Sequence, residues 1–258
     1  MDSTPGNYTP QSQDIDRSNM SRENLTHEFL PDDYPQYDLT FKLIVIGDAF
    51  VGKSCLTSKA TKNTFDKNYS ATVGFEFLVS NIKINNSVCK MQIWDTCGQE
   101  VYRSLITNFY RNSSLAILVY SIDNYESFEN VDLWLKELKA FSNPDCKVLL
   151  IGNKNDLESS RKVDYETGEK FRRDNNLDFF IETSAKTGFN THTVFAEAAK
   201  LLYLDHLEYK DKSHKSRCNS YGSVSSLGSN RSTPYTLHKH DFNKMSTSQS
   251  VKKDGCNC

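Results

Sequence analysis

Hydrophobic and polar residues form distinct blocks along the middle of this chain, and these blocks predict several strands. Residues 79–84 and 89–94 alternate apolar with polar side chains, and Asn-Asn-Ser lies between them. This pattern predicts an antiparallel hairpin. Runs of strand length that are apolar except for Lys42 and Asp178 predict four buried strands, at 41–46, 115–120, 148–151 and 178–181.

Helical patterns fill the gaps between the predicted strands. One apolar stripe recurs every three or four residues over 128–138 and a second over 194–204, which is typical of helices packed on a sheet. Alternating strands and helices predict an α/β fold, a doubly wound, mostly parallel six-stranded sheet with one antiparallel hairpin. Such sheets bind ligands beyond the carboxyl ends of their strands, so the residues there are the first candidates for a site.

Composition divides the 258 residues into a domain at 39–207 and two polar arms. Only nine of residues 1–38 and twelve of residues 208–258 are hydrophobic, and we expect both arms to be mostly disordered. The first arm is acidic, with eight acids and two bases, and the Ser-rich second arm is basic, with nine bases and four acids. The net charge of −2 therefore conceals opposite ends, and no region is basic enough to indicate nucleic-acid binding.

The apolar runs and the cysteines restrict the compartment. No run approaches the ~20 residues of a membrane span, and residues 1–30 lack the apolar core of a signal peptide. Seven cysteines, an odd number, are scattered along the chain, which argues against a disulfide framework. No grouping of Cys and His has the spacing of a zinc site. We therefore expect a protein that is made and kept in the cytosol.

A phosphate-binding motif follows the first buried strand. Residues 47–54 read Gly-Asp-Ala-Phe-Val-Gly-Lys-Ser. The glycines let successive backbone N–H groups face a phosphate chain, and the helix expected near Lys53 adds its positive dipole end. Lys53 can reach the terminal phosphates, and the Ser54 hydroxyl can ligate Mg²⁺. The motif serves kinases, ATPases and GTPases alike.

Two later strand ends select guanine. Residues 152–156 read Gly-Asn-Lys-Asn-Asp, and the Asp156 carboxylate can accept two N–H bonds from a guanine edge. Adenine presents the opposite pattern and would leave that charge unpaired. Residues 182–186 read Glu-Thr-Ser-Ala-Lys, and their backbone N–H groups could meet the guanine carbonyl oxygen. A phosphate-loop kinase would not explain Asp156.

The hairpin strand at 89–94 leads into residues suited to hydrolysis. Asp95 fits the acidic residue that, together with the phosphate-loop serine, lies on the magnesium side of a nucleotide site. Gly98 can bring its backbone N–H close to a γ-phosphate, and Gln99 can orient an attacking water. Gln99 alone would read as a solvated loop amide, but its position behind Asp95 favours the catalytic role.

Together with Thr72, these motifs resemble the Ras superfamily of small GTPases over about residues 39–207. The Rab branch is the most similar, on the strings at 73–77, 90–94, 109–111 and 118–120. The resemblance implies GTP or GDP as bound nucleotide and Mg²⁺ held by Ser54, Thr72 and Asp95. It implies a nucleotide site built from Asp48, Ala49, Val51, Gly52, Lys53, Ser54, Cys55, Phe65, Thr72, Gly98, Asn153, Lys154, Asp156, Ser184, Ala185 and Lys186.

The resemblance also implies a switch and its partners. Thr72 would ligate Mg²⁺ only in the GTP state, and hydrolysis would release the loops around Thr72 and residues 98–110. No arginine in these loops is an obvious catalytic finger, so a partner would accelerate slow hydrolysis by up to ~10³–10⁵-fold. Implied partners of this monomer are an exchange factor, an activating protein, a prenylation escort, a GDP-dissociation inhibitor and effectors that read an aromatic patch of Phe77, Trp94 and Phe109.

One departure from the family pattern lies in the phosphate loop. Phe50 stands where relatives usually have a small residue. A large ring there could crowd the ribose, a water path or an incoming activator, which raises the alternative of a nucleotide-locked or hydrolysis-deficient Rab-like scaffold. Phe50 could instead point to solvent or pack on a switch segment.

The basic arm ends in Cys256-Asn-Cys258. Joined to a Rab-like domain, this resembles the Cys-x-Cys ending that receives two geranylgeranyl chains and differs from the C-a-a-X form. Two lipids make anchoring stable where one is marginal, and the basic arm adds attraction to acidic lipids. We expect a vesicle-trafficking switch on the cytoplasmic face of endosome- or Golgi-type membranes that cycles with the cytosol.

Overall fold

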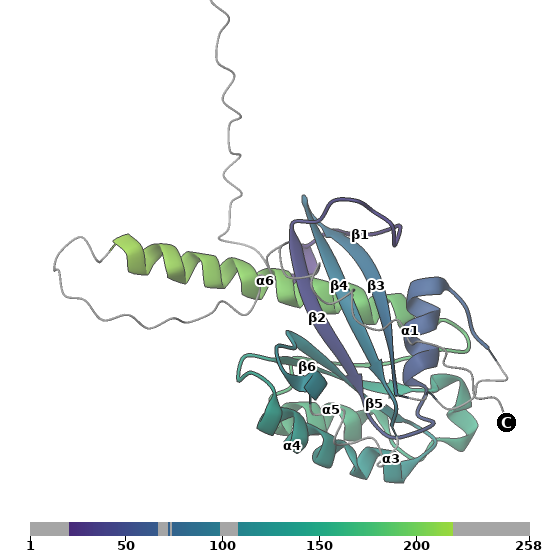
Figure 1. Cartoon of the computed structure of the whole chain (residues 1–258). Helices are drawn as coiled ribbons and strands as arrows, with labels where there is room; N and C mark the ends of the chain where they lie inside the picture. Colours follow the sequence, from purple (N-terminus) through teal and green to yellow (C-terminus); the bar gives the residue numbers. More distant parts are fainter. Residues whose placement is uncertain (1–20, 67–71, 73, 99–107, 219–258) are drawn as a thin grey trace, which may run out of the picture.

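A seven-stranded sheet with helices on both faces forms the centre of the molecule (Figure 1). The computed structural model describes residues 21–66, 72, 74–98 and 108–218. The strands lie in the order β1-β3-β4-β2-β5-β6-β7. Their bounds are β1 His27–Leu30, β2 Leu39–Ile46, β3 Phe75–Ile84, β4 Ser87–Thr96, β5 Leu115–Ser121, β6 Lys147–Asn153 and β7 Phe179–Glu182.

The strand directions confirm the predicted doubly wound architecture. Strands β4, β2, β5, β6 and β7 run parallel to one another, whereas β3 is antiparallel to both β1 and β4. The β3–β4 pair is the predicted hairpin, with Ile84 opposite Ser87. Its turn contains Asn85 at φ 50°, a left-handed conformation that asparagine tolerates better than most residues.

The helices divide between the two faces of the sheet (Figure 1). None of those within the described ranges combines the length and apolar character that a membrane span requires. The α-helices are α1 Lys53–Lys62, α3 Tyr125–Glu129, α4 Val131–Phe141, α5 Tyr165–Asp174 and α6 Thr191–Cys218, and short 3₁₀ segments are η2 Arg22–Asn24 and η4 Asn155–Ser160.

Strand β2 supplies side chains to two separate hydrophobic layers. Leu43 and Val45 pack in the layer that contains residues of α1 and α6. Ile44 and Ile46 point the other way, into the layer that contains Trp134 of α4. Because successive strand residues face opposite sides, a strand buried on both faces must be apolar throughout, which explains the continuous run at 43–46.

The prediction of six strands omitted β1, which lies in the arm expected to be disordered. Leu25 is 4% exposed and belongs to the core, and Arg22 stacks its guanidinium 5.0 Å from the ring centre of Phe179. Asn81 donates through its side-chain amide to the carbonyls of Pro31 and Asp32. Residues 22–32 are therefore folded onto the domain, whereas residues 1–20 lie outside the described part of the chain.

Two helix boundaries also differ from the sequence prediction. The stripe over 128–138 is divided between α3 and α4, which meet at Asn130. Helix α6 continues to Cys218, past the boundary at 207, and an (i, i+4) ion pair of Glu208 with Lys212 lies on this extension. Such pairs support a helix that has little left to pack against. Residues 219–258 lie outside the described ranges.

Candidate nucleotide-binding site

Two glycines shape the loop that follows β2. Gly47 has a φ of 137°, and a Cβ added there would lie 2.1 Å from the carbonyl oxygen of Val119. Gly52 has a φ of 93°, and its Cβ would lie 2.5 Å from the side-chain nitrogen of Asn153. A side chain at either position would be both strained and obstructed, so the curl of the loop requires glycine.

Lys53 opens α1, and its amine lies on the loop. Its Nζ donates to the carbonyl oxygens of Gly47 at 2.9 Å and Asp48 at 2.7 Å. Burial lowers the pKa of Lys53 to about 8, although the Asp95 carboxylate works against this shift. The ammonium is thus poorly solvated and would gain from an anionic ligand placed on the loop.

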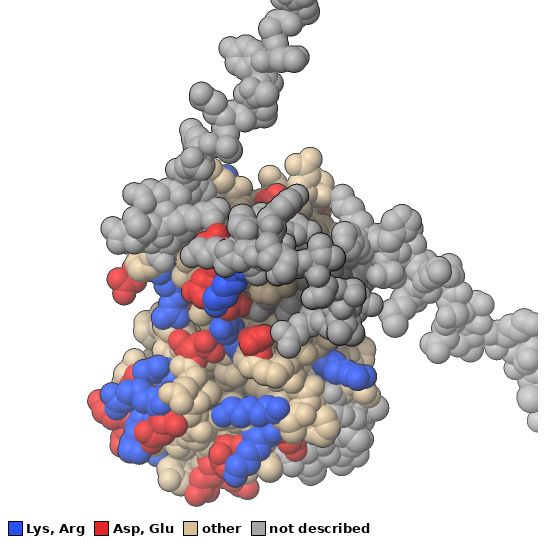
Figure 2. Space-filling view, turned by 90° about the vertical axis from the view of Figure 1, so that its left-hand side faces the viewer, with Lys and Arg blue, Asp and Glu red and all other residues tan. Residues whose placement is uncertain are grey.

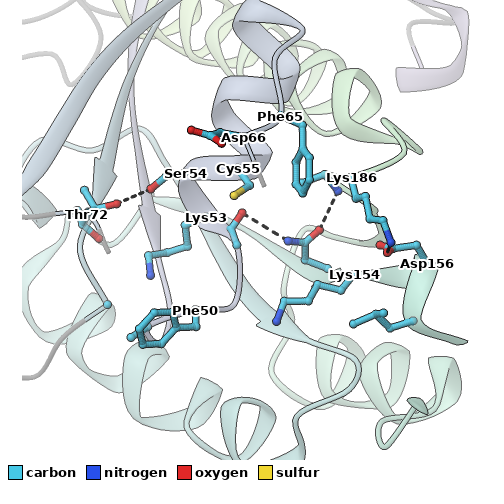
Figure 3. A pocket seen from close by; sticks show the side chains of 17 residues that line it. Phe50, Lys53, Ser54, Cys55, Phe65, Asp66, Thr72, Lys154, Asp156 and Lys186 are labelled. Atoms are coloured by element: carbon cyan, nitrogen blue, oxygen red, sulfur yellow. Dashed lines mark hydrogen bonds and ion pairs between the residues drawn. The ribbon is translucent and has the colours of Figure 1, made fainter. Parts of the chain in front are cut away.

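Two hydroxyls and a carboxylate converge beside Lys53. The Oγ of Ser54 lies 2.7 Å from the Oγ1 of Thr72 (Figure 3). Asp95 is fully buried, and burial raises its pKa to about 6, an effect that the Ser54 hydroxyl and Lys53 oppose. Within the described residues neither Asp95 carboxylate oxygen accepts a hydrogen bond of normal geometry. This set of hard oxygen donors, with an unsatisfied buried carboxylate, fits Mg²⁺.

Asn153, at the end of β6, joins the loop after β2 to the loop after β7. Its side-chain amide donates to the carbonyl oxygen of Val51 at 2.8 Å. Its Oδ1 accepts from the Thr183 hydroxyl at 3.1 Å and from the backbone N–H of Ala185 at 3.3 Å. The buried amide therefore fixes the distance between the two ends of the site.

Asp156 is held ionised at the far end of the site. Ser184 donates to its Oδ1 at 2.6 Å. The Lys186 ammonium lies 3.3 Å from its Oδ2, and Figure 3 shows these two side chains close together. Burial alone would raise the pKa of Asp156, but these partners hold it below its ordinary value. Lys154, in a left-handed conformation with φ 66°, precedes the short 3₁₀ segment that carries Asp156.

A single cavity of about 430 Å³ brings both ends of the site together. Phe65 borders it near Lys186, and Phe50 borders it on the side of Lys53 (Figure 3). The predicted nucleotide-binding residues that line it are Ala49, Gly52, Lys53, Ser54, Cys55, Phe65, Thr72, Gly98, Asn153, Lys154, Asp156, Ala185 and Lys186.

Four of the residues predicted to bind nucleotide or Mg²⁺ do not line the cavity. Val51 and Asp95 are buried behind it, and Ser184 instead supports Asp156. The side chain of Asp48 turns away from it, toward α4, and accepts from the Trp134 indole. Gln99, the predicted catalytic residue, lies outside the described residues, as do the predicted lipidation sites Cys256 and Cys258.

The sequence prediction left out three residues that line the cavity. Asp66, Thr96 and Leu157 each directly follow a predicted site residue. Their position next to such a residue was the one signal in the sequence that could have identified them. Phe50 also lines the cavity, and 74% of it is exposed. Phe50 thus borders the cavity and also faces solvent. The sequence left these two positions of the ring open as alternatives.

The aromatic residues predicted as an effector surface do lie together, and they gain a fourth member. Ring centres of Phe77 and Phe109 lie 5.1 and 5.2 Å from that of Trp94, and Phe75 lies 4.6 Å from Phe109. Phe75 is 50% exposed and Phe77 is 44% exposed. The Lys42 ammonium lies 5.7 Å from the Trp94 ring centre. The cluster therefore lies at the surface where β3 and β4 meet the segment that carries Phe109.

Comparisons with known proteins agree with this geometry. The family model described as the Ras family matches residues 42–204. The chain is 44% identical over 167 residues to the Ras-related protein RABA1b of Arabidopsis thaliana, covering 65% of this chain and 77% of that protein. It is 37% identical over 221 residues to RABA1c of the same plant, covering 86% and 95% respectively. The chain therefore belongs to the Rab family of Ras-superfamily small GTPases, the GTP hydrolases of vesicle trafficking.

Proposed function

We propose that this protein is a GTP/GDP-controlled switch that binds and slowly hydrolyses GTP and recruits effectors in intracellular vesicle traffic. One observation carries this proposal. A single cavity combines the desolvated Lys53 amine, the Ser54 and Thr72 hydroxyl pair and the ionised Asp156 carboxylate. The amine and the two hydroxyls suit a phosphate chain, and the carboxylate suits the N–H edge of a guanine.

The phosphate end would act through charge. Backbone N–H groups of residues 48–54 and the amino end of α1 favour an anion, and Lys53 would exchange its carbonyl partners for phosphate oxygens. Ser54, Thr72 and Asp95 would hold Mg²⁺, which when bound neutralises charge on the terminal phosphates. Thr72 would keep its segment on the pocket while GTP is present and leave after hydrolysis, as loop switches do.

The base end would select guanine through Asp156. An ionised carboxylate accepts both N–H groups of a guanine edge, whereas adenine would leave it unpaired. Ser184 and Lys186 keep the carboxylate charged and oriented. Phe65, which borders the same cavity, would pack on the face of the base.

The substitution Asp156→Asn tests this base recognition. It should weaken GTP binding by about 10²–10⁴-fold, because two charge-assisted hydrogen bonds are lost. Xanthosine triphosphate, whose extra carbonyl can accept from the new amide, should then bind more tightly than GTP. Competition titrations against a fluorescent GDP measure both affinities.

Asp174→Asn, an exposed carboxylate on α5, serves as the matched control and should bind GTP like the wild type. Unchanged GTP affinity in Asp156→Asn would refute the assignment of the base site.

Hydrolysis is assigned to Gln99, which would orient the attacking water. Without an arginine supplied by a partner we expect a slow intrinsic rate. The alternative, a nucleotide-locked or hydrolysis-deficient scaffold, is favoured by Phe50 at the cavity border. Purified protein that contains only GTP, with no turnover over hours, would support the scaffold.

Regulators and membranes complete the proposed cycle. The rings of Phe77, Trp94 and Phe109 form a cluster with Phe75, and those of Phe75 and Phe77 are exposed. This suits effectors, since aromatic clusters at the surface are common interface anchors. An exchange factor and an activating protein would drive the switch. A prenylation escort and a GDP-dissociation inhibitor would handle a lipidated terminus and deliver the protein to endosome- or Golgi-type membranes.

A further inference from the structure

The side chain of Asp48 contacts neighbouring helices instead of the cavity. Its Oδ1 accepts a hydrogen bond of 2.7 Å from the indole nitrogen of Trp134. Its Oδ2 accepts another of 2.7 Å from the side-chain amide of Asn130. These partners lie more than 80 residues further along the chain, and neither lines the cavity. Both carboxylate oxygens of Asp48 thus accept hydrogen bonds from residues outside the phosphate loop.

The two donors belong to a rigid part of the molecule. Trp134 is 2% exposed and packs in the hydrophobic layer of α4. Asn130 lies where α3 meets α4, and its side chain makes no capping hydrogen bond to either helix. Its amide is therefore available to Asp48. Bonds between a carboxylate and such fixed donors are among the stronger ones in proteins.

The backbone of Asp48 meets the functional parts of the cavity. Its carbonyl oxygen accepts from the Lys53 ammonium at 2.7 Å. A Cβ added to Gly98 would lie 2.2 Å from the carbonyl carbon of Asp48, so the chain after β4 rests directly on this peptide. One residue consequently joins the α3–α4 junction, the phosphate-loop lysine and the segment that leads to Gln99.

We propose that Asp48 is a positioning residue, whose side chain fixes the phosphate loop against the α3–α4 junction in the geometry that retains nucleotide. This inference rests on the proposed nucleotide site. Without the two hydrogen bonds, the loop backbone would move more freely, and its N–H groups and Lys53 would lose their alignment toward the phosphates. Nucleotide would then leave faster, although no group that touches it has been removed.

Release of a fluorescent GDP analogue, mant-GDP, from the full-length protein tests this role. Asp48→Ala should release mant-GDP about tenfold faster than the wild type in excess Mg²⁺, because hydrogen bonds to a charged group are lost. Asn130→Ala and Trp134→Phe each remove one donor and should give intermediate rates. Asn124→Ala is the matched control, because that side chain accepts from Ser127 at the start of α3 and does not reach the loop.

A second measurement separates positioning from general destabilisation. Melting temperatures are recorded for every variant, and release is compared at a temperature well below all of them. The double variant Asp48→Ala with Trp134→Phe should release mant-GDP no faster than Asp48→Ala alone, since both remove the same bond.

Wild-type release rates in Asp48→Ala, or equal acceleration in Asn124→Ala, would overturn the positioning role while leaving the proposed function intact. A wild-type protein that retains no mant-GDP would overturn the proposed function itself, and the positioning role with it.

Discussion

At residue 50 the phosphate loop carries an aromatic ring on a backbone that L-amino acids rarely adopt. Phe50 has a φ of 63°, a conformation that costs a non-glycine residue roughly 1–2 kcal/mol. The ring is 74% exposed, so its burial contributes little free energy to offset this strain. Strain that packing does not explain, at the border of a ligand cavity, points to a functional effect on what enters or leaves.

Replacing this ring by hydrogen should speed hydrolysis. In Phe50→Gly we expect single-turnover GTP hydrolysis to accelerate, chiefly when a Rab-directed activating protein is added, because the path to the terminal phosphate is opened. Glycine also adopts the positive φ without strain, so the fold should be retained. Labelled phosphate release, with and without the activating protein, provides the measurement.

Phe141→Ala is the control for this experiment, because it removes another exposed phenylalanine, at the end of α4, that does not line the cavity. Equal rates in Phe50→Gly and the wild type under both conditions would eliminate the obstruction hypothesis.

Residues that recognise a ligand could be predicted from the sequence because they cluster in short motifs. Lys53, Asp95 and Asp156 each belong to a motif at the carboxyl end of a strand, and the topology of the sheet brings such positions together. The partners of Asp48 could not be predicted in this way. A hydrogen bond between Asp48 and Trp134 depends on how α4 packs, and no local pattern records it.

Among the elements, β1 illustrates what a local pattern omits. Only Phe29 and Leu30 are apolar in this four-residue strand, and its first two residues are exposed. Pairing with the edge of β3 supplies its hydrogen bonds, and flanking contacts fix the register: Thr26 donates to the Asn85 side chain from both its backbone and its hydroxyl. The β3–β4 hairpin, in contrast, could be predicted from the alternation of apolar and polar residues in its sequence.

Docking of this strand should depend on Leu25, which is buried in the same layer as residues of α6. Leu25→Ala should lower the free energy of unfolding by about 2–4 kcal/mol, the usual loss for a buried leucine. Urea denaturation of the nucleotide-bound protein measures the change. Glu28→Ala, an exposed position on β1 itself, should change stability by less than about 0.5 kcal/mol. Equal stabilities of the Leu25→Ala protein and the wild type would mean that this segment contributes nothing to the fold.

Over the whole chain, the two ends carry opposite net charges, whereas the domain between them carries a mixture of both signs. On the face shown in Figure 2, basic and acidic side chains lie interspersed on the coloured surface. The first 38 residues carry a net charge of −6, from two bases and eight acids, and the last 51 carry +5, from nine bases and four acids. Attraction to acidic lipids would therefore come from the basic arm.

Helix α6 determines where that arm starts. It begins next to the base-recognition loop, where Asn190 donates to the carbonyl oxygen of Glu182. Its 28 residues extend for about 42 Å at the usual helical rise. Figure 1 shows its end projecting beyond the sheet, so the arm leaves the domain far from the base-recognition loop. A lipid anchor on the arm would leave the cavity accessible to regulators.

Anchoring should require both terminal cysteines, because one lipid chain binds a membrane only marginally and two bind it stably. In eukaryotic cells the wild type should sediment with membranes, whereas Cys256→Ser with Cys258→Ser should remain in the soluble fraction, and either single variant should divide between the two. Cys218→Ser, at the end of α6, is the matched control and should sediment like the wild type. Retained mant-GDP binding in the double variant would establish that its domain is folded. A folded double variant that still sediments would show that the membrane is reached by another route.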